Sequence, residues 1–257
     1  MEPYAFFPFN PTPKVVYWIT EEEVRSMQDN TLQNQLLSLL VQPMRIDEIR
    51  RALPEAGKNE LKDALDSLIA DGKIMKNKKN RFAVSAHYGC VAGTYLATER
   101  AFGFVTPDAA EGESKPDDLF IPPNASGGAW HGDRVLVKLT ERKNGRGRRE
   151  ATVIRVLRRA GKELTGALVQ RGKAYFVQPT SKKYPEIAVD RHHLGDARVG
   201  DRVAVSISHY GDEKFAPQGV IQADLGEDGT MEASIAAILH ENAVFDFFPD
   251  EVLRQAD

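Results

Sequence analysis

The stretch GDRVLVKL at residues 132–139 returns 68 residues later as GDRVAVSI at 200–207, and this repeat decides the fold. A second pair, FVTP at 104–107 and FVQP at 176–179, is offset by 72 residues. Each copy lies within a series of five short β-rich runs separated by turn residues, which is typical of a small β-barrel. Two motifs that recur at nearly the same offset indicate a tandem duplication. We therefore predict two consecutive five-stranded barrels.

The runs that supply these strands follow the same order in both halves. The first barrel is expected to use CVAGTYLAT, AFGFVTP, DLFIPP, DRVLVKL and ATVIRVL, and the second ELTGALVQ, AYFVQP, EIAVD, DRVAVSI and QGVIQAD. Alternation of apolar and polar residues in several runs places one face of the strand in a core and leaves the other face outside.

Before the barrels, the sequence changes to helical patterns. Leucine spacing predicts a helix over 31–42 that Pro43 ends, and apolar spacing predicts a second helix over 45–53. A third helix, in KNELKDALDSLIADGKI, is stopped by Gly72, and residues 72–84 then form two short strands around the tip KNKKN. Three short helices followed by a β-hairpin are the order of a winged helix.

The tip of this hairpin is expected to lie against phosphates, because it carries four cations: Lys76, Lys78, Lys79 and Arg81. A role in protein contacts alone is the alternative. The polar face of the third helix carries several acidic side chains and few hydrogen-bond donors, so it is poorly suited to reading bases in a major groove. We expect non-specific nucleic-acid contact or a packing role for this unit.

Charge is distributed unevenly along the 257-residue chain. The formal net charge is −3, yet residues 138–183 hold 14 Lys or Arg against 3 Glu, and residues 224–257 hold 9 acidic residues against one Arg. Basic density confined to one region indicates a surface for a polyanion, with a solvated charged face as the simpler alternative.

Composition also argues against several classes of protein. No apolar run approaches the roughly 18 to 20 residues that cross a bilayer, so no membrane partner is expected. The N-terminal stretch has no basic lead and is broken by prolines, unlike a secretory signal. The single cysteine, Cys90, excludes an internal disulfide and a cysteine-based zinc site, and it favours a reducing, cytoplasmic location.

Three phenylalanines of the first predicted barrel share one strand face. Phe102 and Phe104 lie two residues apart on the second strand, and Phe120 lies on the third. Residues of the opposite parity supply the competing core: Val105, Leu119 and Ile121. In barrels of the oligonucleotide-binding type these two strands form the face that holds nucleic acid. We therefore predict a stacking platform for unpaired bases, with a core role for the rings as the alternative.

RAFGFV and DLFIP resemble the two RNA-binding motifs of cold-shock domains, Lys-Gly-Phe-Gly-Phe-Ile and Val-Phe-Val-His-Phe. The resemblance implies RNA contacts at four positions: Arg100, Phe102, Phe104 and Phe120. The sequence departs from that family at Ala101, where the family has glycine, and at Pro122 and Pro123, where it has histidine and phenylalanine. The departures narrow the expected platform.

The second barrel keeps less of this pattern. Ala174 stands at the position equivalent to Phe102, and only Phe176 remains. We expect this barrel to bind RNA less by stacking and more by charge.

The order of winged helix, cold-shock barrel and second barrel resembles the N-terminal part of the ribonuclease R and ribonuclease II family of 3′→5′ exoribonucleases, over about residues 29–257. HGDRVLVKL, the basic loop after it and the closing MEASIAAILHENAVFDFFPDEVLRQAD resemble that family as well. The resemblance implies processive hydrolysis of single-stranded RNA at a magnesium-dependent domain. A loop of five cations would guide the strand: Arg142, Lys143, Arg146, Arg148 and Arg149.

No catalytic or metal site is expected within the chain itself. Hydrolysis by two metal ions needs clustered carboxylates, and the Asp-rich motif of the family is missing. Asp117 and Asp118 would point to opposite faces, and Asp246 and Asp250 are separated by a proline. The six histidines share no ligand spacing. Mg²⁺ is therefore expected only for a catalytic domain of the same parent chain.

The sequence thus predicts an α+β, multidomain chain. We expect an N-terminal extension (1–28), a winged helix (29–86), two OB or cold-shock barrels (87–160 and 161–225) and a helical lead-in to a catalytic domain (226–257). The expected partners are single-stranded RNA and, through the winged helix, structured RNA. A free-standing RNA chaperone is the first alternative, and a winged-helix DNA-binding regulator is the second.

Overall fold

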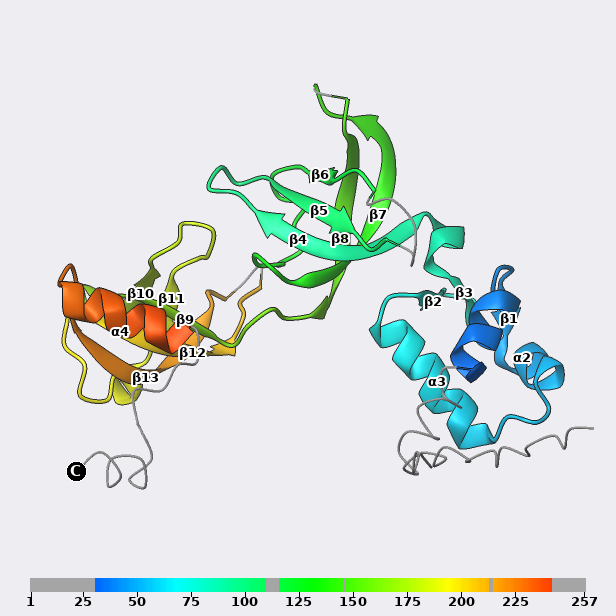
Figure 1. The fold of residues 1–257 in the computed structure, drawn as a ribbon, viewed down its shortest axis with the longest axis horizontal. Helices are drawn as coiled ribbons and strands as arrows, with labels where there is room; N and C mark the ends of the chain where they lie inside the picture. Colours follow the sequence, from blue (N-terminus) through cyan, green and yellow to red (C-terminus); the bar gives the residue numbers. More distant parts are fainter. Residues whose placement is uncertain (1–30, 110–115, 146, 213–214, 242–257) are drawn as a thin grey trace, which may run out of the picture.

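The computed structural model describes residues 31–109, 116–145, 147–212 and 215–241. Three units follow one another: a helical unit with a small sheet, then two β-barrels (Figure 1). The expected N-terminal extension lies outside the described residues, as does the end of the expected lead-in after residue 241. None of the helices in the described ranges has the length and apolarity needed to cross a membrane.

The first unit has the helix order of a winged helix. Residues 31–39 are helical, and α2 (Ile46–Ala52), α3 (Lys58–Ala70), β2 (Ile74–Lys76) and β3 (Arg81–Val84) follow. A two-residue strand, β1 (Met44–Arg45), pairs with β3 and makes the hairpin a three-stranded sheet. No periodic pattern can reveal a strand of two residues, so the sequence did not predict it. The core holds the leucines expected inside, including Leu36, Leu61 and Leu68.

Ten strands form the two barrels. The first barrel contains β4 (Cys90–Ala97), β5 (Gly103–Pro107), β6 (Leu119–Ile121), β7 (Arg134–Lys143) and β8 (Arg149–Arg158). The second contains β9 (Glu163–Arg171), β10 (Ala174–Pro179), β11 (Ile187–Val189), β12 (Asp201–His209) and β13 (Gln218–Glu227). Both close in the same cyclic order, with a parallel pair at β6–β8 and at β11–β13. The predicted pair of five-stranded barrels is confirmed.

The duplication extends to a close approach of two strands at equivalent points. Gly93 faces Pro107 across β4 and β5, and Gly166 faces Pro179 across β9 and β10. A Cβ atom on Gly93 would lie 2.8 Å from Cγ1 of Val105, closer than side chains approach one another. Glycine is therefore required at this position of the first barrel, and the matching glycine of the second barrel supports a common origin.

The end of helix α3 is fixed against the first barrel. Arg155 donates from Nη2 to the carbonyl of Ile69 at 2.6 Å. Arg134 makes a bidentate pair with Asp108, at 2.8 and 2.7 Å, and also reaches the carbonyl of Asp71 at 3.4 Å. Cations suit the last carbonyls of a helix, which carry the negative end of its dipole.

The side chain of Trp130 links the two barrels. Trp130 precedes β7 in the first barrel, yet it packs with the core of the second barrel, 5.0 Å from the ring of Tyr210. Arg159 lies over the same tyrosine ring at 4.1 Å and pairs with the buried carboxylate of Asp133 at 2.8 Å. The packing of Trp130 in the second core and the contact of Arg159 with the Tyr210 ring restrict how the barrels can move relative to one another.

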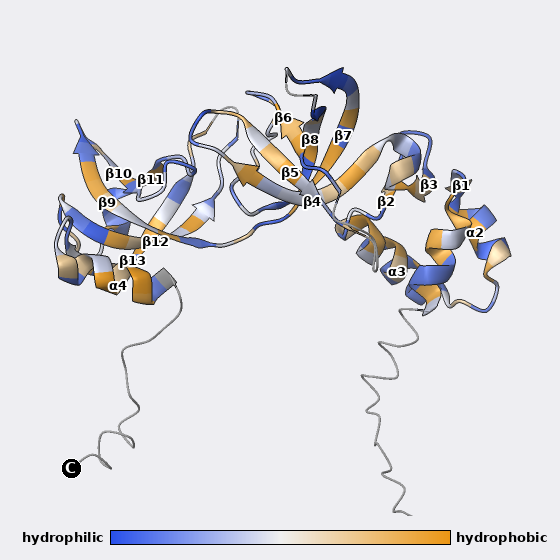
Figure 2. Ribbon diagram, turned by 45° about the horizontal axis from the view of Figure 1, so that its top comes forward, coloured by the Kyte–Doolittle hydropathy of each residue, from blue (hydrophilic) through white to orange (hydrophobic). Residues whose placement is uncertain are grey.

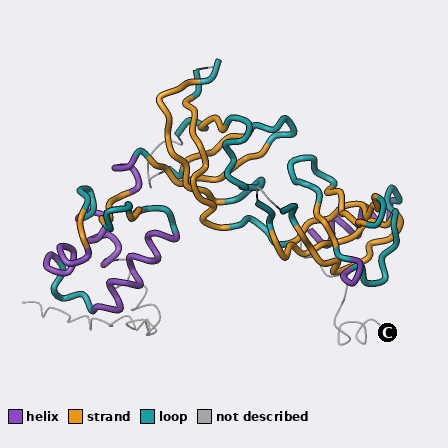
Figure 3. Tube along the Cα trace, turned by 180° about the vertical axis from the view of Figure 1, so that it is seen from behind, coloured by secondary structure: helices purple, strands orange, loops and turns teal. Residues whose placement is uncertain are grey.

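The chain after the second barrel forms helix α4 (Met231–Glu241), which lies against β9, β12 and β13. Figure 3 shows it (purple) beside the strands of that barrel. Its inner face is made of small residues, Ala233 and Ala237, while Met231, Ile235 and Ile238 on the other side are exposed. Small inner residues allow the helix axis to come close to the strands.

Candidate nucleic-acid interface

The three phenylalanines predicted to share a face do so. Phe104 on β5 pairs directly with Phe120 on β6. The ring centres of Phe102, Phe104 and Phe120 are 5.6 to 5.9 Å apart, so they form one cluster, the aromatic platform. All three side chains are half-buried, whereas the residues of opposite parity, Val105, Leu119 and Ile121, are in the core. The rings are displayed rather than enclosed.

Two small residues position the platform. Ala101 has a φ of 52°, in the left-handed region, and this tight bend turns Phe102 onto the face that carries Phe104. Gly103 sits between the two rings, and a Cβ atom there would lie 2.5 Å from Cε2 of Tyr95. The Tyr95 ring, 4% exposed, fills the space under the glycine. Burial raises the pKa of its hydroxyl.

A basic hairpin stands beside the platform. Residues 140–145 and 147–149 at the ends of β7 and β8 belong to its tip, and Figure 2 shows the end of β7 as hydrophilic (blue). The guanidinium of Arg148 lies over the ring of Phe104, with Cζ 5.0 Å from the ring centre. The backbone N–H of Arg148 donates to the side-chain oxygen of Asn144 at 2.9 Å, which fixes the turn. The hairpin and the platform therefore form one surface.

The remaining cations predicted for this surface differ in their contacts. Arg142 and Lys143 are exposed, and neither has an ion pair within the described ranges. Arg149 donates from Nε to the carbonyl of Thr140 at 3.3 Å, within the hairpin itself. Arg100 is exposed at the bend before Phe102, and Arg146 lies outside the described residues.

The second barrel presents a weaker version of the same face. Phe176 is half-buried on β10, and its partner on β11 is Ala188, where the first barrel has Phe120. Arg171 lies over the Phe176 ring at 5.6 Å and pairs with Glu186 through two hydrogen bonds of 2.6 and 2.7 Å. The bond from Arg171 lowers the pKa of Glu186. The sequence did not predict that Arg171, paired with Glu186, covers the Phe176 ring, because only strand pairing brings residues 171 and 186 together.

The winged-helix cations also separate into two groups. Lys78 and Lys79 are exposed at the tip of the hairpin. Lys76 lies over the ring of Phe82, with Nζ 5.5 Å from the ring centre. Arg81 turns back into its own unit, where it donates to the carbonyl of Pro43 at 2.9 Å. Only the first two project from the tip.

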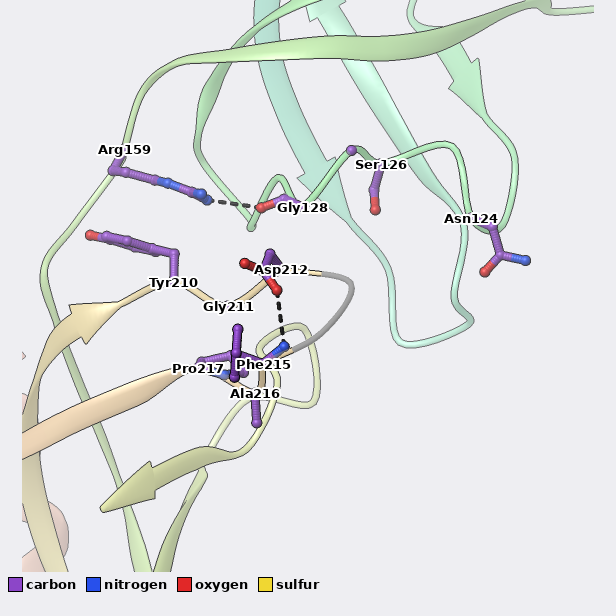
Figure 4. A pocket seen from close by; sticks show the side chains of 11 residues that line it. Asn124, Ser126, Gly128, Arg159, Tyr210, Gly211, Asp212, Phe215, Ala216 and Pro217 are labelled. Atoms are coloured by element: carbon purple, nitrogen blue, oxygen red, sulfur yellow. Dashed lines mark hydrogen bonds between the residues drawn. The ribbon is translucent and has the colours of Figure 1, made fainter. Parts of the chain in front are cut away.

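A cavity of about 890 Å³ lies where the two barrels meet (Figure 4). The loop with Gly128 and Ser126 lines one side, and residues 210–212 and 215–217 line the other. Arg159 also lines the cavity, and it donates to the carbonyl of Gly128 at 2.9 Å. The cavity lies beside the interface between the barrels and is separate from the aromatic platform.

His131, next to Trp130, is also held at this interface. Its ring lies 6.1 Å from that of Tyr184 in the second barrel. Its Nδ1 atom is buried and has no hydrogen-bond partner in the described part of the chain. Burial and, to a smaller extent, the charge of Lys183 lower the pKa of His131.

The described residues contain no group of three or more His, Cys, Asp or Glu side chains that could hold a metal ion. Asp118, one of the adjacent carboxylates weighed as a metal ligand, accepts a hydrogen bond from Oγ1 of Thr106 at 2.7 Å. The donor set that two-metal hydrolysis requires is therefore absent from the described ranges.

Comparison with protein families matches each barrel to a separate family. Residues 93–156 match the family model described as Ribonuclease B OB domain, and residues 176–249 match the Cold shock domain model. Together they cover most of both barrels, including the whole of strands β5 and β6.

Curated relatives are similar over most of the chain. Ribonuclease R of Vibrio parahaemolyticus is 28% identical over 205 residues, 77% of this chain and 24% of that protein. Ribonuclease R of Acidithiobacillus ferrooxidans is 28% identical over 218 residues, 83% of this chain and 48% of that protein. The chain thus spans between a quarter and a half of the length of these relatives.

A solved structure shows the same fold. The apo form of Mycoplasma genitalium RNase R superposes with a TM-score of 0.54 at 18% identity, covering 65% of this chain and 26% of that one. The same enzyme in complex with ribose methylated single-stranded RNA gives equal values. At this level of identity the likeness concerns the fold alone.

Proposed function

We propose that this chain, a ribonuclease R-like region with tandem OB and cold-shock barrels, binds single-stranded RNA mainly through its first barrel. The observation that carries the proposal is the aromatic platform with the basic hairpin beside it. Aromatic rings displayed on a barrel face stack with unpaired bases, and each stacked base contributes about 1 to 3 kcal/mol of binding free energy. Exposed arginines and lysines next to the rings attract the phosphates of the same strand.

We also propose that the two barrels contribute unequally to RNA binding. The first barrel offers three rings, and the second offers one ring already covered by Arg171. The bidentate bond to Glu186 neutralises that arginine. We expect the second barrel to contribute less to affinity and to act mainly by positioning the strand.

The activity of a longer parent protein is a further part of the proposal. The curated relatives are ribonuclease R enzymes of greater length, which supports a 3′→5′ exoribonuclease as the parent. Because the described residues do not fit a two-metal site, Mg²⁺ would be held by a catalytic domain of that parent rather than by this region. The tip lysines Lys78 and Lys79 would contact structured RNA, and the cytoplasm is the proposed location.

Fluorescence anisotropy with a labelled single-stranded 12-mer RNA tests the proposal. The wild-type chain should bind it, and the double variant Phe102→Ala with Phe104→Ala should bind at least about tenfold more weakly, from the loss of one or two stacked bases. Phe176→Ala is the matched control and should cost much less. Equal binding by the double variant and the wild type would exclude the platform, and a preference for duplex DNA would favour a DNA-binding regulator.

A further inference from the structure

A cavity of about 410 Å³ lies in the winged-helix unit, between helix α2, helix α3 and the β2–β3 hairpin. We propose that it binds one unpaired nucleotide of an RNA strand, as a second RNA site distinct from the aromatic platform. The inference rests on the proposed function only in taking RNA as the ligand. We call this cavity the wing pocket.

The floor of the wing pocket is apolar. Leu61 and Leu65 of α3 and Phe82 of β3 line it, with exposures of 1%, 3% and 9%, and Ile46 of α2 completes it. An apolar floor suits the flat face of a nucleobase, since small-molecule sites are mostly apolar with a few polar groups. Two side-chain amides in the lining, Asn59 and Asn80, can both donate to and accept from a base edge.

The rim of the wing pocket is basic. Four cations line it against one acid, Asp66, and they are Arg50, Lys58, Lys62 and Lys76. Arg50 has an exposed partner, Asp47, at 3.7 Å. Lys76 lies over the ring of Phe82, with Nζ 5.5 Å from the ring centre, whereas Lys58 and Lys62 have no ion pair among the residues that the structure describes. Their charge is therefore available to an anionic ligand, in a chain whose formal net charge is −3.

The arrangement favours a single nucleotide over a duplex. The volume is near the lower end of the roughly 300 to 1,000 Å³ typical of small-molecule sites, so the pocket admits one base and not a groove of paired bases. Along the exposed side of α3, Asp63 and Asp66 follow Lys62 and would repel the phosphates of a duplex laid on the helix. The lysines, as mobile point charges, can reach the phosphates on either side of an inserted base.

Methyl NMR spectra of the whole chain test this proposal directly. A 5′-phosphorylated uridine trinucleotide is the probe, and the methyl groups of Ile46, Leu61 and Leu65 are the reporters. We expect these signals to shift in a saturable way with the wild-type chain and equally with the Phe102→Ala, Phe104→Ala variant. The platform variant thus distinguishes the two sites. Even if the first barrel does not bind RNA, shifts of the Ile46, Leu61 and Leu65 methyl signals still show whether the wing pocket binds the trinucleotide.

Charge-reversal variants provide the second arm. Lys58→Glu with Lys62→Glu should weaken the pocket affinity at least about fivefold, because two phosphate contacts become repulsive. Lys73→Glu, an exposed lysine of the same unit outside the pocket, is the matched control and should change it little. Reporter signals that do not move with the trinucleotide, or an equal loss in both variants, would overturn the proposal. So would tighter binding of a hexaglutamate peptide to the same methyl groups, which would make the pocket a site for acidic protein segments.

Discussion

The guanidinium of Arg148 lies over the ring of Phe104, with Cζ 5.0 Å from the ring centre, although Arg148 lies in the turn between β7 and β8 and Phe104 lies on β5. The contact brings a cation of the basic hairpin onto the aromatic platform. A strand of RNA that stacks on the rings therefore meets a positive charge at the same place. This relationship allows the stacking and charge contributions to be separated by mutation.

Arg148→Ala should weaken RNA binding several-fold and reduce the slope of log K against log salt by about 0.7, the value for one phosphate contact on a single strand. Arg148→Lys keeps the charge but loses the flat guanidinium, so it should keep the slope and lose part of the affinity. Anisotropy titrations from 50 to 300 mM salt measure both quantities. Arg198→Ala, at an exposed arginine of the second barrel, serves as control. An unchanged slope for Arg148→Ala would show that Arg148 makes no phosphate contact.

Glu186→Gln should increase RNA affinity a few-fold. The substitution removes the carboxylate that neutralises Arg171 over the Phe176 ring, so the guanidinium becomes free to meet a phosphate. Glu232→Gln on the exposed side of α4 changes the net charge equally and should have a smaller effect. An equal gain in RNA affinity for both variants would show that the effect comes from net charge and not from releasing Arg171.

Ala101→Gly should stabilise the chain by roughly 0.5 to 1 kcal/mol. A φ of 52° costs a residue with a Cβ atom about 1 to 2 kcal/mol, and glycine removes that cost while losing some entropy on folding. Urea unfolding measures the change. Ala109→Gly, at an exposed alanine without a positive φ, should be neutral or slightly destabilising. A loss of stability in Ala101→Gly would contradict the assigned backbone strain.

Gly103→Ala should destabilise the first barrel by about 1 to 3 kcal/mol, because the new methyl group would overlap the buried Tyr95 ring. It should also displace Phe102 and Phe104 and so weaken RNA binding. Gly145→Ala, where no atom lies within 4 Å, is the control and should change stability little. The double variant Gly103→Ala, Tyr95→Val should lose less unfolding free energy than the sum of the losses in the two single variants. Strict additivity would contradict the steric explanation.

Acidification should destabilise the junction between the barrels through His131. The pKa of this side chain is lowered from 6.5 in the folded chain, chiefly by burial and then by Lys183. Between the two pKa values the unfolded chain binds more protons, so the stability present above pH 6.5 is lost as the pH falls through the folded pKa. The unfolding free energy is measured at pH 8 and at pH 5.5 for the wild type and for His131→Gln. The fall between the two pH values should be larger for the wild type. Equal losses would exclude His131 as a contributor.

Much of the architecture follows from the sequence itself. The repeats at residues 132–139 and 200–207 predicted two barrels with the correct strands, because a strand alternates its faces with a period of two and the duplicated turns mark its ends. The same alternation placed Phe102 and Phe104 opposite Val105, and the structure displays the two rings and buries the valine. These are local properties, fixed by residue type and spacing.

Contacts between residues far apart in sequence needed the tertiary structure. The position of Arg148 over Phe104, the covering of Phe176 by Arg171 and Glu186, and the packing of Trp130 with the core of the other barrel all depend on how strands pair and barrels meet. The wing pocket likewise arises only when α2, α3 and the hairpin come together. The sequence alone thus determined which residues face outward. The three-dimensional packing decided which of those residues share a surface, because side-chain proximity depends on strand register and interdomain contact rather than on local periodicity.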